Sequence, residues 1–196
     1  LDVFQTCLTA ERLRTLITER ARSTLAGVLF DWNDRALAQF MVKADVPFVV
    51  VEGDFDDLPV AAVIQDDSGG TLAALEHLYS QGRRRMAYLG FDDSWVHRRR
   101  REGAFRAFHM RHGLDLPEER LAFASFAAGA DGRQEAARLL ALDTRPDAVF
   151  VANRELLDGF MVAARTSALD VSREVGVVVW GNPGPGDRQS LIDHVS

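Results

Sequence analysis

Short apolar segments alternate with amphipathic helical segments along almost the whole sequence, and this alternation limits the fold more than any other feature. Residues 25–30 (LAGVLF), 46–51 (VPFVVV) and 86–90 (MAYLG) are three of the apolar segments. Such short apolar runs between turn-forming residues are typical of strands buried on both faces. Strands joined through helices form parallel sheets, because a parallel pair needs a long crossover. The sequence therefore predicts an α/β fold with parallel sheets flanked by helices.

The predicted elements continue this alternation along the chain. Asp131 and Asn153 are residue types that cap helices, and Gln134 stands at the capping-box spacing from Asp131. Gly82 and Gly113 follow two helical segments, where glycine commonly ends a helix. The other expected strands lie at residues 2–6, 60–65, 121–126, 147–152 and 174–180, and helices are expected at 12–22, 34–44, before Gly82, before Gly113, after Asp131 and after Asn153.

Composition limits the class of protein and its surroundings. A length of 196 residues with 47% apolar content suits one large domain or two small lobes. A net charge of −6 argues against a nucleic-acid-binding module, which normally carries a basic face. The single cysteine, Cys7, excludes an internal disulfide framework and fits a reducing compartment. No apolar run approaches the roughly 20 residues that span a bilayer, and no export signal is visible. We therefore expect a soluble, cytoplasmic protein without a membrane partner.

The stretch from Tyr88 to Gly103 (YLGFDDSWVHRRRREG) carries the strongest indication of a ligand site. It reads as a strand end, a polar loop and a helix start, and α/β proteins bind ligands where strands end. Four consecutive arginines, residues 98–101, open the helix. Successive helix residues point about 100° apart, so the four cannot share one solvated face. At least one arginine is expected to point inward.

Other polar clusters do not make a catalytic or metal site. Asp54, Asp56 and Asp57 lack the glycine and distant glutamate of a calcium loop. His109 and His112 share a helix face without a third metal ligand. The glycines of residues 181–186 do not form a dinucleotide motif, and no nucleophile elbow, phosphate loop or acid-base pair is present. We therefore expect no catalytic residue, no metal and no cofactor.

Four motifs occur in order along the chain. They are Asp66-Asp67 with Gly70, His77-Leu78 and Gly82, continued by RRMAYLG at 84–90; Arg100 with Gly103 and Phe105; RPDAVFVANR at 145–154; and VGVVVWGN at 175–182. With these motifs the chain resembles the effector-binding domain of the lac repressor and galactose repressor family of transcriptional regulators. That domain shares a two-lobed fold with periplasmic sugar-binding proteins. The agreement in spacing extends over nearly the whole chain.

The resemblance implies a division into two similar lobes of the periplasmic-binding-protein type I. Residues 1–82 would form the amino-terminal lobe without its first strand, residues 83–183 the second lobe, and residues 184–196 the start of the crossover back to the first. The family places a helix-turn-helix DNA-binding module ahead of this domain, and we expect it to be missing here. Because a missing central strand leaves backbone groups unpaired, we expect the chain alone to be poorly stable.

The resemblance also implies a set of ligand-contacting residues. Arg100 matches the arginine with which the family contacts its ligand, and Phe126 lies near the position of an aromatic that covers the ligand. Asn153 is expected either to contact the ligand or only to cap its helix. For the aromatic candidates, core packing is the alternative, and for Arg100 it is a surface ion pair. The further candidates are Trp95, Phe91, Trp180 and Asn182.

Two departures from the family bear on the ligand. Arg154 and Gly181 stand where family members often have aspartates that accept hydrogen bonds from sugar hydroxyls. A guanidinium only donates hydrogen bonds, whereas an ionised carboxylate only accepts them. The ligand is therefore expected to be more anionic or less hydroxylated than a sugar, unless the pocket is degenerate.

The predicted function is that of a ligand-sensing domain without catalytic activity. A sugar or related small polar metabolite would bind in the cleft between the lobes and control DNA binding by the helix-turn-helix module of a homodimer. A solute-binding protein of a sugar transporter is the alternative, and it would need a signal peptide. An α/β enzyme is the alternative from another class.

Overall fold

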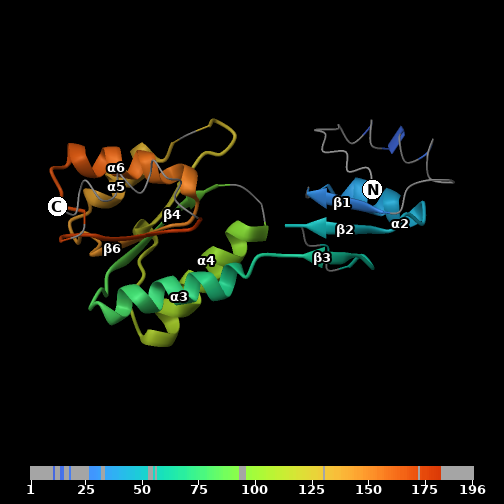
Figure 1. Cartoon of the computed structure of the whole chain (residues 1–196). Coiled ribbons are helices and arrows are strands. Elements are labelled where there is room, and N and C mark those ends of the chain that lie inside the picture. The colour runs from blue at the N-terminus through green and yellow to red at the C-terminus, as the bar shows by residue number, and fades with distance from the viewer. Residues whose placement is uncertain are drawn as a thin grey trace. The chain divides into compact units, whose positions relative to one another are not determined.

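The computed structural model describes residues 11, 14–15, 18, 27–31, 34–52, 55, 57–92, 96–129, 131–171 and 173–181. The chain forms two compact units, the amino-terminal unit Leu1–Gln65 and the carboxyl-terminal unit Asp66–Ser196 (Figure 1). The strand expected at residues 2–6 and most of the helix expected at 12–22 lie outside the described residues.

In the amino-terminal unit, three parallel strands form sheet A in the order β1-β2-β3. The elements are β1 (Val28–Asp31), α2 (Arg35–Lys43), β2 (Phe48–Val51) and β3 (Ala61–Val63). Asp34 starts α2 because its carboxylate accepts the Leu37 N–H at 3.0 Å. The buried face of α2, with Leu37 and Met41, packs against Val50 of the central strand and Phe55. The strands predicted at 25–30, 46–51 and 60–65 correspond to β1, β2 and β3.

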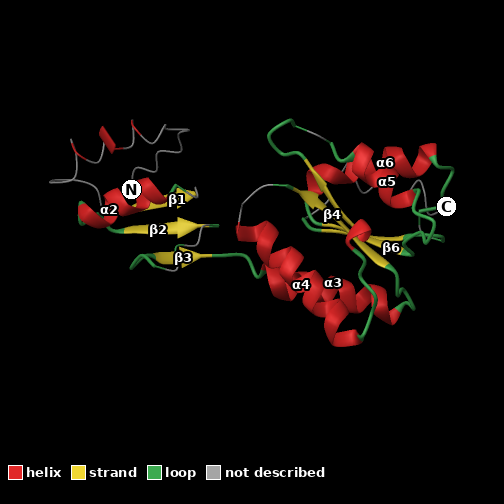
Figure 2. Cartoon of the chain, turned by 180° about the vertical axis from the view of Figure 1, so that it is seen from behind, coloured by secondary structure: helices red, strands yellow, loops and turns green. Residues whose placement is uncertain are grey.

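In the carboxyl-terminal unit, four parallel strands form sheet B in the order β5-β4-β6-β7. The strands are β4 (Met86–Phe91), β5 (Leu121–Ala124), β6 (Ala148–Val151) and β7 (Gly176–Val179), and the α-helices are α3 (Asp67–Ser80), α4 (Val96–His112), α5 (Arg133–Leu140) and α6 (Leu157–Thr166). Two 3-10 turns, η1 (Glu118–Arg120) and η2 (Arg154–Leu156), precede β5 and α6. Helices α3 and α4 cover one face of sheet B, and α5 and α6 cover the other (Figure 2).

Strand β4 is buried along its whole length, and its side chains divide between the two faces of sheet B. Met86 and Tyr88 join the core beneath α3 and α4, whereas Ala87, Leu89 and Phe91 join the core beneath α5 and α6. Alternate residues of a strand point to opposite faces, so an unbroken apolar run is required when both faces are covered. The α/β prediction with buried parallel strands is confirmed here.

The two compact units divide at Gln65–Asp66, whereas the division predicted from the sequence lies near Gly82. Helix α3 accounts for the difference, because it packs against α4 and contacts β6 and β7. Its Leu75 and Leu78 lie in the same core as Tyr88. In the structure α3 therefore belongs to the carboxyl-terminal unit.

The start of α5 differs from the predicted capping box. Gly132 occupies the N-cap position in a left-handed conformation, φ 75°, and no side chain caps the helix. Asp131 instead accepts the Arg133 N–H at 3.0 Å. That hydrogen bond, together with the Arg133 guanidinium, keeps the pKa of the Asp131 carboxyl below its ordinary value. The prediction that Asp131 is the cap residue is therefore wrong, because the chain needs glycine one position later.

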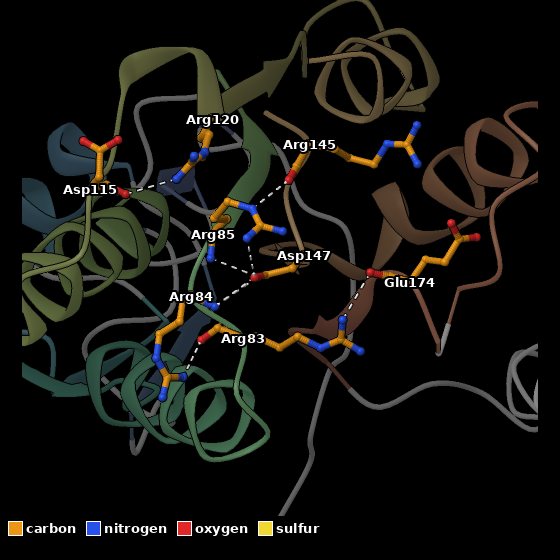
Figure 3. Close-up of polar contacts among 8 residues, drawn as sticks. All are labelled: Arg83, Arg84, Arg85, Asp115, Arg120, Arg145, Asp147 and Glu174. Carbon is orange, nitrogen blue, oxygen red and sulfur yellow. Dashed lines mark hydrogen bonds and ion pairs between the residues drawn. The ribbon is translucent and has the colours of Figure 1, made fainter. Parts of the chain in front are cut away.

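The amino edge of sheet B, where its four strands begin, is pinned by Asp147 (Figure 3). The Asp147 carboxylate accepts the Arg84 N–H at 3.1 Å and the Arg85 N–H at 2.9 Å, which joins the start of β4 to the start of β6. The Arg84 guanidinium donates to the Tyr79 carbonyl at the end of α3, and Arg145 donates to Leu140 at the end of α5. These arginines complement the negative carboxyl ends of the helices.

His109 is a buried histidine whose protonation opposes folding. It is 1% exposed, its Nδ1 donates to the Phe105 carbonyl at 2.8 Å, and its ring packs on Phe105 and Phe108. Burial lowers the pKa of His109, and the nearby charges of Arg120 and His112 lower it further.

We predict that His109→Phe reduces the acid sensitivity of the carboxyl-terminal unit. Below about pH 6.5 the unfolded chain binds a proton at this residue that the folded chain resists, so the free energy of unfolding falls as pH falls. Phenylalanine removes that contribution and keeps an aromatic ring beside Phe105. The measurement is the free energy of unfolding at pH 7.5 and at steps down to pH 5. An unchanged dependence on pH in the variant would contradict the prediction.

Candidate functional site

The carboxyl edge of sheet B is the candidate ligand site. Because its strands are parallel, β4, β5, β6 and β7 all end at this edge. The chain continues from these ends towards α4, into a turn at 126–129, into η2 and into Trp180–Gly181. Ligands of α/β proteins bind beyond the carboxyl ends of strands, where loops can present polar groups.

A buried ionic network lies at this edge, and we call Asp67, His97, Arg101 and the Ala152 carbonyl the carboxyl-edge network. Asp67 is the first residue of α3, and its side chain is fully buried. Its Oδ1 accepts Nε–H of Arg101 at 2.7 Å, and its Oδ2 accepts Nδ1–H of His97 at 2.6 Å. The Nη1 of Arg101 also donates to the Ala152 oxygen at 2.7 Å. The network thus joins α3, α4 and the end of β6.

Trp180 packs directly on this network. The guanidinium carbon of Arg101 lies 4.4 Å from the centroid of the Trp180 ring, a cation–π arrangement. On α3, a Cβ at Gly70 would lie 2.5 Å from the same ring, so only glycine allows the indole this close. The Trp180 ring therefore packs against Arg101 and the start of α3, and its role as a ligand contact stays a prediction.

The four arginines at residues 98–101 point in different directions, as the helix geometry predicts. Arg98 forms an ion pair with Glu102 at 3.1 Å and lies over the Phe123 ring. Arg99 is exposed, and Arg100 is half-buried. Arg101 is the arginine buried in the body of the unit. The expectation of an inward arginine is confirmed, but sequence reasoning singled out Arg100 and missed Arg101. The signal available was the spacing of His97 and Arg101, which places two hydrogen-bond donors on one helix face.

Phe91 and Phe126 form a pair on the β4–β5 side of the edge. Their rings meet edge to face with centroids 5.3 Å apart. Phe91 ends β4 and belongs to the core beneath α5 and α6, whereas Phe126 is 51% exposed. The Asp92 carboxylate accepts the Phe126 N–H at 3.0 Å, which holds the turn that carries Phe126 against the end of β4. Of the two aromatics, Phe126 is the exposed one.

Asn153 follows β6 and precedes η2, at the position predicted for a helix cap. It is half-buried and extended, and its side chain makes no capping hydrogen bond. Its amide is therefore not committed to η2. A Cβ at Gly181 would lie 3.2 Å from Cβ of Arg154, so the two positions that differ from the family are neighbours in space. Two further predicted contacts, Trp95 and Asn182, lie outside the described residues.

The described residues hold no group of three histidine, cysteine, aspartate or glutamate side chains that could bind a metal ion. In the same part of the chain, none of the helices has the length and apolar character needed to cross a membrane.

Comparison with known proteins gives the family. The model of the periplasmic binding protein-like domain matches residues 75–189, all within the carboxyl-terminal unit. The chain belongs to this family. The predicted periplasmic-binding-protein fold is thereby confirmed, and the regulators among the relatives confirm the predicted resemblance to lac repressor-type regulators.

Relatives of this periplasmic binding protein-like domain are transcriptional regulators. The chain is 26% identical over 152 residues to the probable HTH-type transcriptional repressor ExuR of Bacillus subtilis, covering 77% of this chain and 45% of that protein. A LacI-family regulatory protein from Chloroflexus aggregans is 26% identical with a TM-score of 0.73, and the match covers 85% of this chain and 59% of that one. The transcriptional regulator CelR, in a complex with cellobiose, is 27% identical with a TM-score of 0.72, and the match covers 87% of this chain and 52% of that one. The chain thus spans less than half the length of ExuR.

Proposed function

We propose that the chain is the ligand-sensing part of a transcriptional regulator, and that it binds a small polar molecule at the carboxyl edge of sheet B. The observation that carries the proposal is the arrangement of this edge, where α4, the turn at 126–129 and η2 bring Arg100, Phe126 and Asn153 to the ends of parallel strands. The family match and the regulators among the relatives support it. The CelR–cellobiose complex supports a sugar-like ligand class.

In this proposal the ligand acts through the cleft that the family forms between its two lobes. It changes DNA binding by a helix-turn-helix module of the kind that the family places ahead of the domain, in a homodimer in the cytoplasm. The ligand can shift the regulator only by binding two lobe arrangements with unequal affinity. The domain itself carries out no reaction. The relatives named as an HTH-type transcriptional repressor and an HTH-type transcriptional regulator favour a regulator over a transporter's solute-binding protein.

The residues around the edge favour a ligand with an anionic group. Arg154 and Gly181 replace aspartates of the family pattern, which removes acceptors for sugar hydroxyls and adds a positive charge. A planar guanidinium binds a carboxylate through two parallel hydrogen bonds. We infer that a sugar acid or a similar carboxylated metabolite binds more tightly than the corresponding neutral sugar.

A paired ligand panel tests the proposed function. The probes are cellobiose, glucose and galactose, together with glucuronate and galacturonate, titrated into the full chain by calorimetry. We expect the carboxylated member of a pair to bind more tightly, and Arg100→Ala to weaken that binding by about 10- to 100-fold, the effect of one charged hydrogen bond. Arg99→Ala, a change at the exposed neighbour, is the matched control. Failure of every probe to bind, or equal affinities for wild type and Arg100→Ala, would count against the proposal.

A further inference from the structure

We propose that the carboxyl-edge network positions Arg100 and Asn153 and fixes them to the point where the chain crosses between its two units. This inference rests on the proposed function for the role of Arg100 and Asn153. The contacts of the network itself are made by the described residues and do not depend on the proposed function. Arg101 and Asp67 are thus positioning residues, which act through their neighbours.

The first step is that charges are buried where packing alone would not require them. The side chain of Asp67 is 0% exposed and that of Arg101 is 8% exposed. Removing two charges from water is costly, and apolar residues of similar volume often give equal or greater stability. A buried ion pair therefore contributes mainly geometry, because its hydrogen bonds are satisfied in one arrangement only. At this edge the geometry concerns three elements, α3, α4 and the end of β6.

The second step is that each anchor is the chain neighbour of a proposed ligand contact. Arg101 follows Arg100 on α4, and Ala152 precedes Asn153 at the end of β6. One guanidinium spans both elements, since its Nε donates to Asp67 and its Nη1 donates to Ala152, each at 2.7 Å. A planar fork holds two acceptors in fixed relative positions, which a lysine cannot do. The spacing between Arg100 and Asn153 is therefore set by Arg101.

The third step concerns the crossover. The units divide at Gln65–Asp66, and Asp67 is the next residue along the chain. Asp66 caps α3 by accepting the Gly69 N–H at 2.9 Å, and Asp67 enters the network one position later. A displacement of the chain that reaches Asp67 would therefore act on the contact that also holds Arg101. A displacement of Arg100 or Asn153 would act on the same arginine through their chain neighbours Arg101 and Ala152.

Ligand-free hydrogen exchange of the full chain tests this arrangement. In Arg101→Gln we expect amides of residues 66–70 and 152–156 to exchange about tenfold faster or more, because both segments lose an anchor. Amides at the amino edge, at residues 84–86 and 147–149, should keep their rates, since Asp147 pins them independently. Arg111→Gln is the matched control, because Arg111 lies on the same helix as Arg101 and forms an exposed ion pair with Glu76 of α3.

A second variant separates positioning from charge and from folding. Arg101→Lys keeps a positive charge beside Asp67 but cannot hold both Asp67 and the Ala152 carbonyl. Amides of residues 66–70 should therefore regain their protection, while those of residues 152–156 should still exchange faster than in the wild type. If Arg101→Gln fails to fold, the exchange rates of Arg101→Lys alone show whether Arg101 holds residues 152–156. Equal acceleration throughout the carboxyl-terminal unit, or unchanged rates at 152–156 in both variants, would overturn the proposal. Neither result depends on a ligand, so failure of the ligand panel would leave this measurement intact.

Discussion

Arg101→Leu is expected to destabilise the carboxyl-terminal unit by about 3–5 kcal/mol, the cost of leaving one partner of a buried ion pair without the other. In the variant, His97 is the side-chain partner that Asp67 keeps among the described residues, and the Ala152 carbonyl and the Trp180 ring lose their contacts with the guanidinium. The measurement is the opening free energy of β4 and β6 amides by hydrogen exchange. This readout follows the unit itself, because the two units need not unfold together.

Two comparisons show whether burial of the charge causes this loss. Arg111→Leu removes an ion pair with Glu76 whose side chains are 62% and 45% exposed, so we expect a change of about 0–1 kcal/mol. The double variant Asp67→Leu/Arg101→Leu removes both charges and should recover much of the stability, because paired apolar residues suffer no uncompensated charge. This account would be contradicted if Arg101→Leu were no less stable than Arg111→Leu. It would also be contradicted if the double variant lost the stability contributions of Asp67 and of Arg101 in full, with no recovery.

Local sequence patterns predicted the elements of this fold because those patterns depend on nearest neighbours. The apolar run at Met86–Phe91 marks a strand covered on both sides, and the structure places its side chains alternately in two cores. The unit boundary depends instead on distant partners. Leu75 and Leu78 identify an apolar face of α3, but nothing in their spacing says that Tyr88 and Phe105 cover it.

The position of the candidate site was predictable from the sequence, but the contacts of its individual residues were less so. The end of β4 and the arginine run indicate the carboxyl edge from sequence alone, because parallel strands share that edge. The identity of the inward arginine depends on the partners of α4. Asp67 lies 34 positions from Arg101 in the chain, and this pairing has no local signature. A second aspartate after a helix cap, facing a histidine and an arginine four residues apart, is the pattern to seek in such chains.

The structure also gives physical reasons for motifs that the sequence matched only by resemblance. Asp147 of the RPDA segment accepts backbone N–H groups from Arg84 and Arg85, so it joins two strands at the amino edge. Gly82 has φ 86°, a conformation that favours glycine. Gly90 lies against the Tyr88 ring, where a Cβ would come within 2.6 Å of it. These motif positions maintain the fold on which the candidate site is built.

Gly159→Ala is expected to cost about 3 kcal/mol, the upper end of what overpacking a tight core usually costs. Gly159 lies in α6 against the chain that enters α5, where a Cβ would overlap the Asp131 carbonyl oxygen and lie 2.9 Å from the Arg133 nitrogen. These are backbone atoms, which cannot move aside by changing a rotamer. The segment before α5 would therefore have to shift away from α6.

Gly103→Ala is the matched control for this change, since it is the same substitution in another helix, α4. Outside the backbone of α4 itself, no atom of the described residues lies within 4 Å of a Cβ at Gly103, so alanine there should stabilise the unit by about 0.5–1 kcal/mol through helix propensity. Opening free energies of α5 and α6 amides measure the first variant, and those of α4 amides measure the second. Because the displaced segment follows the turn that carries Phe126, we also expect Gly159→Ala to speed exchange at residues 126–129. A stabilised Gly159→Ala variant would show that the two segments do not pack this closely.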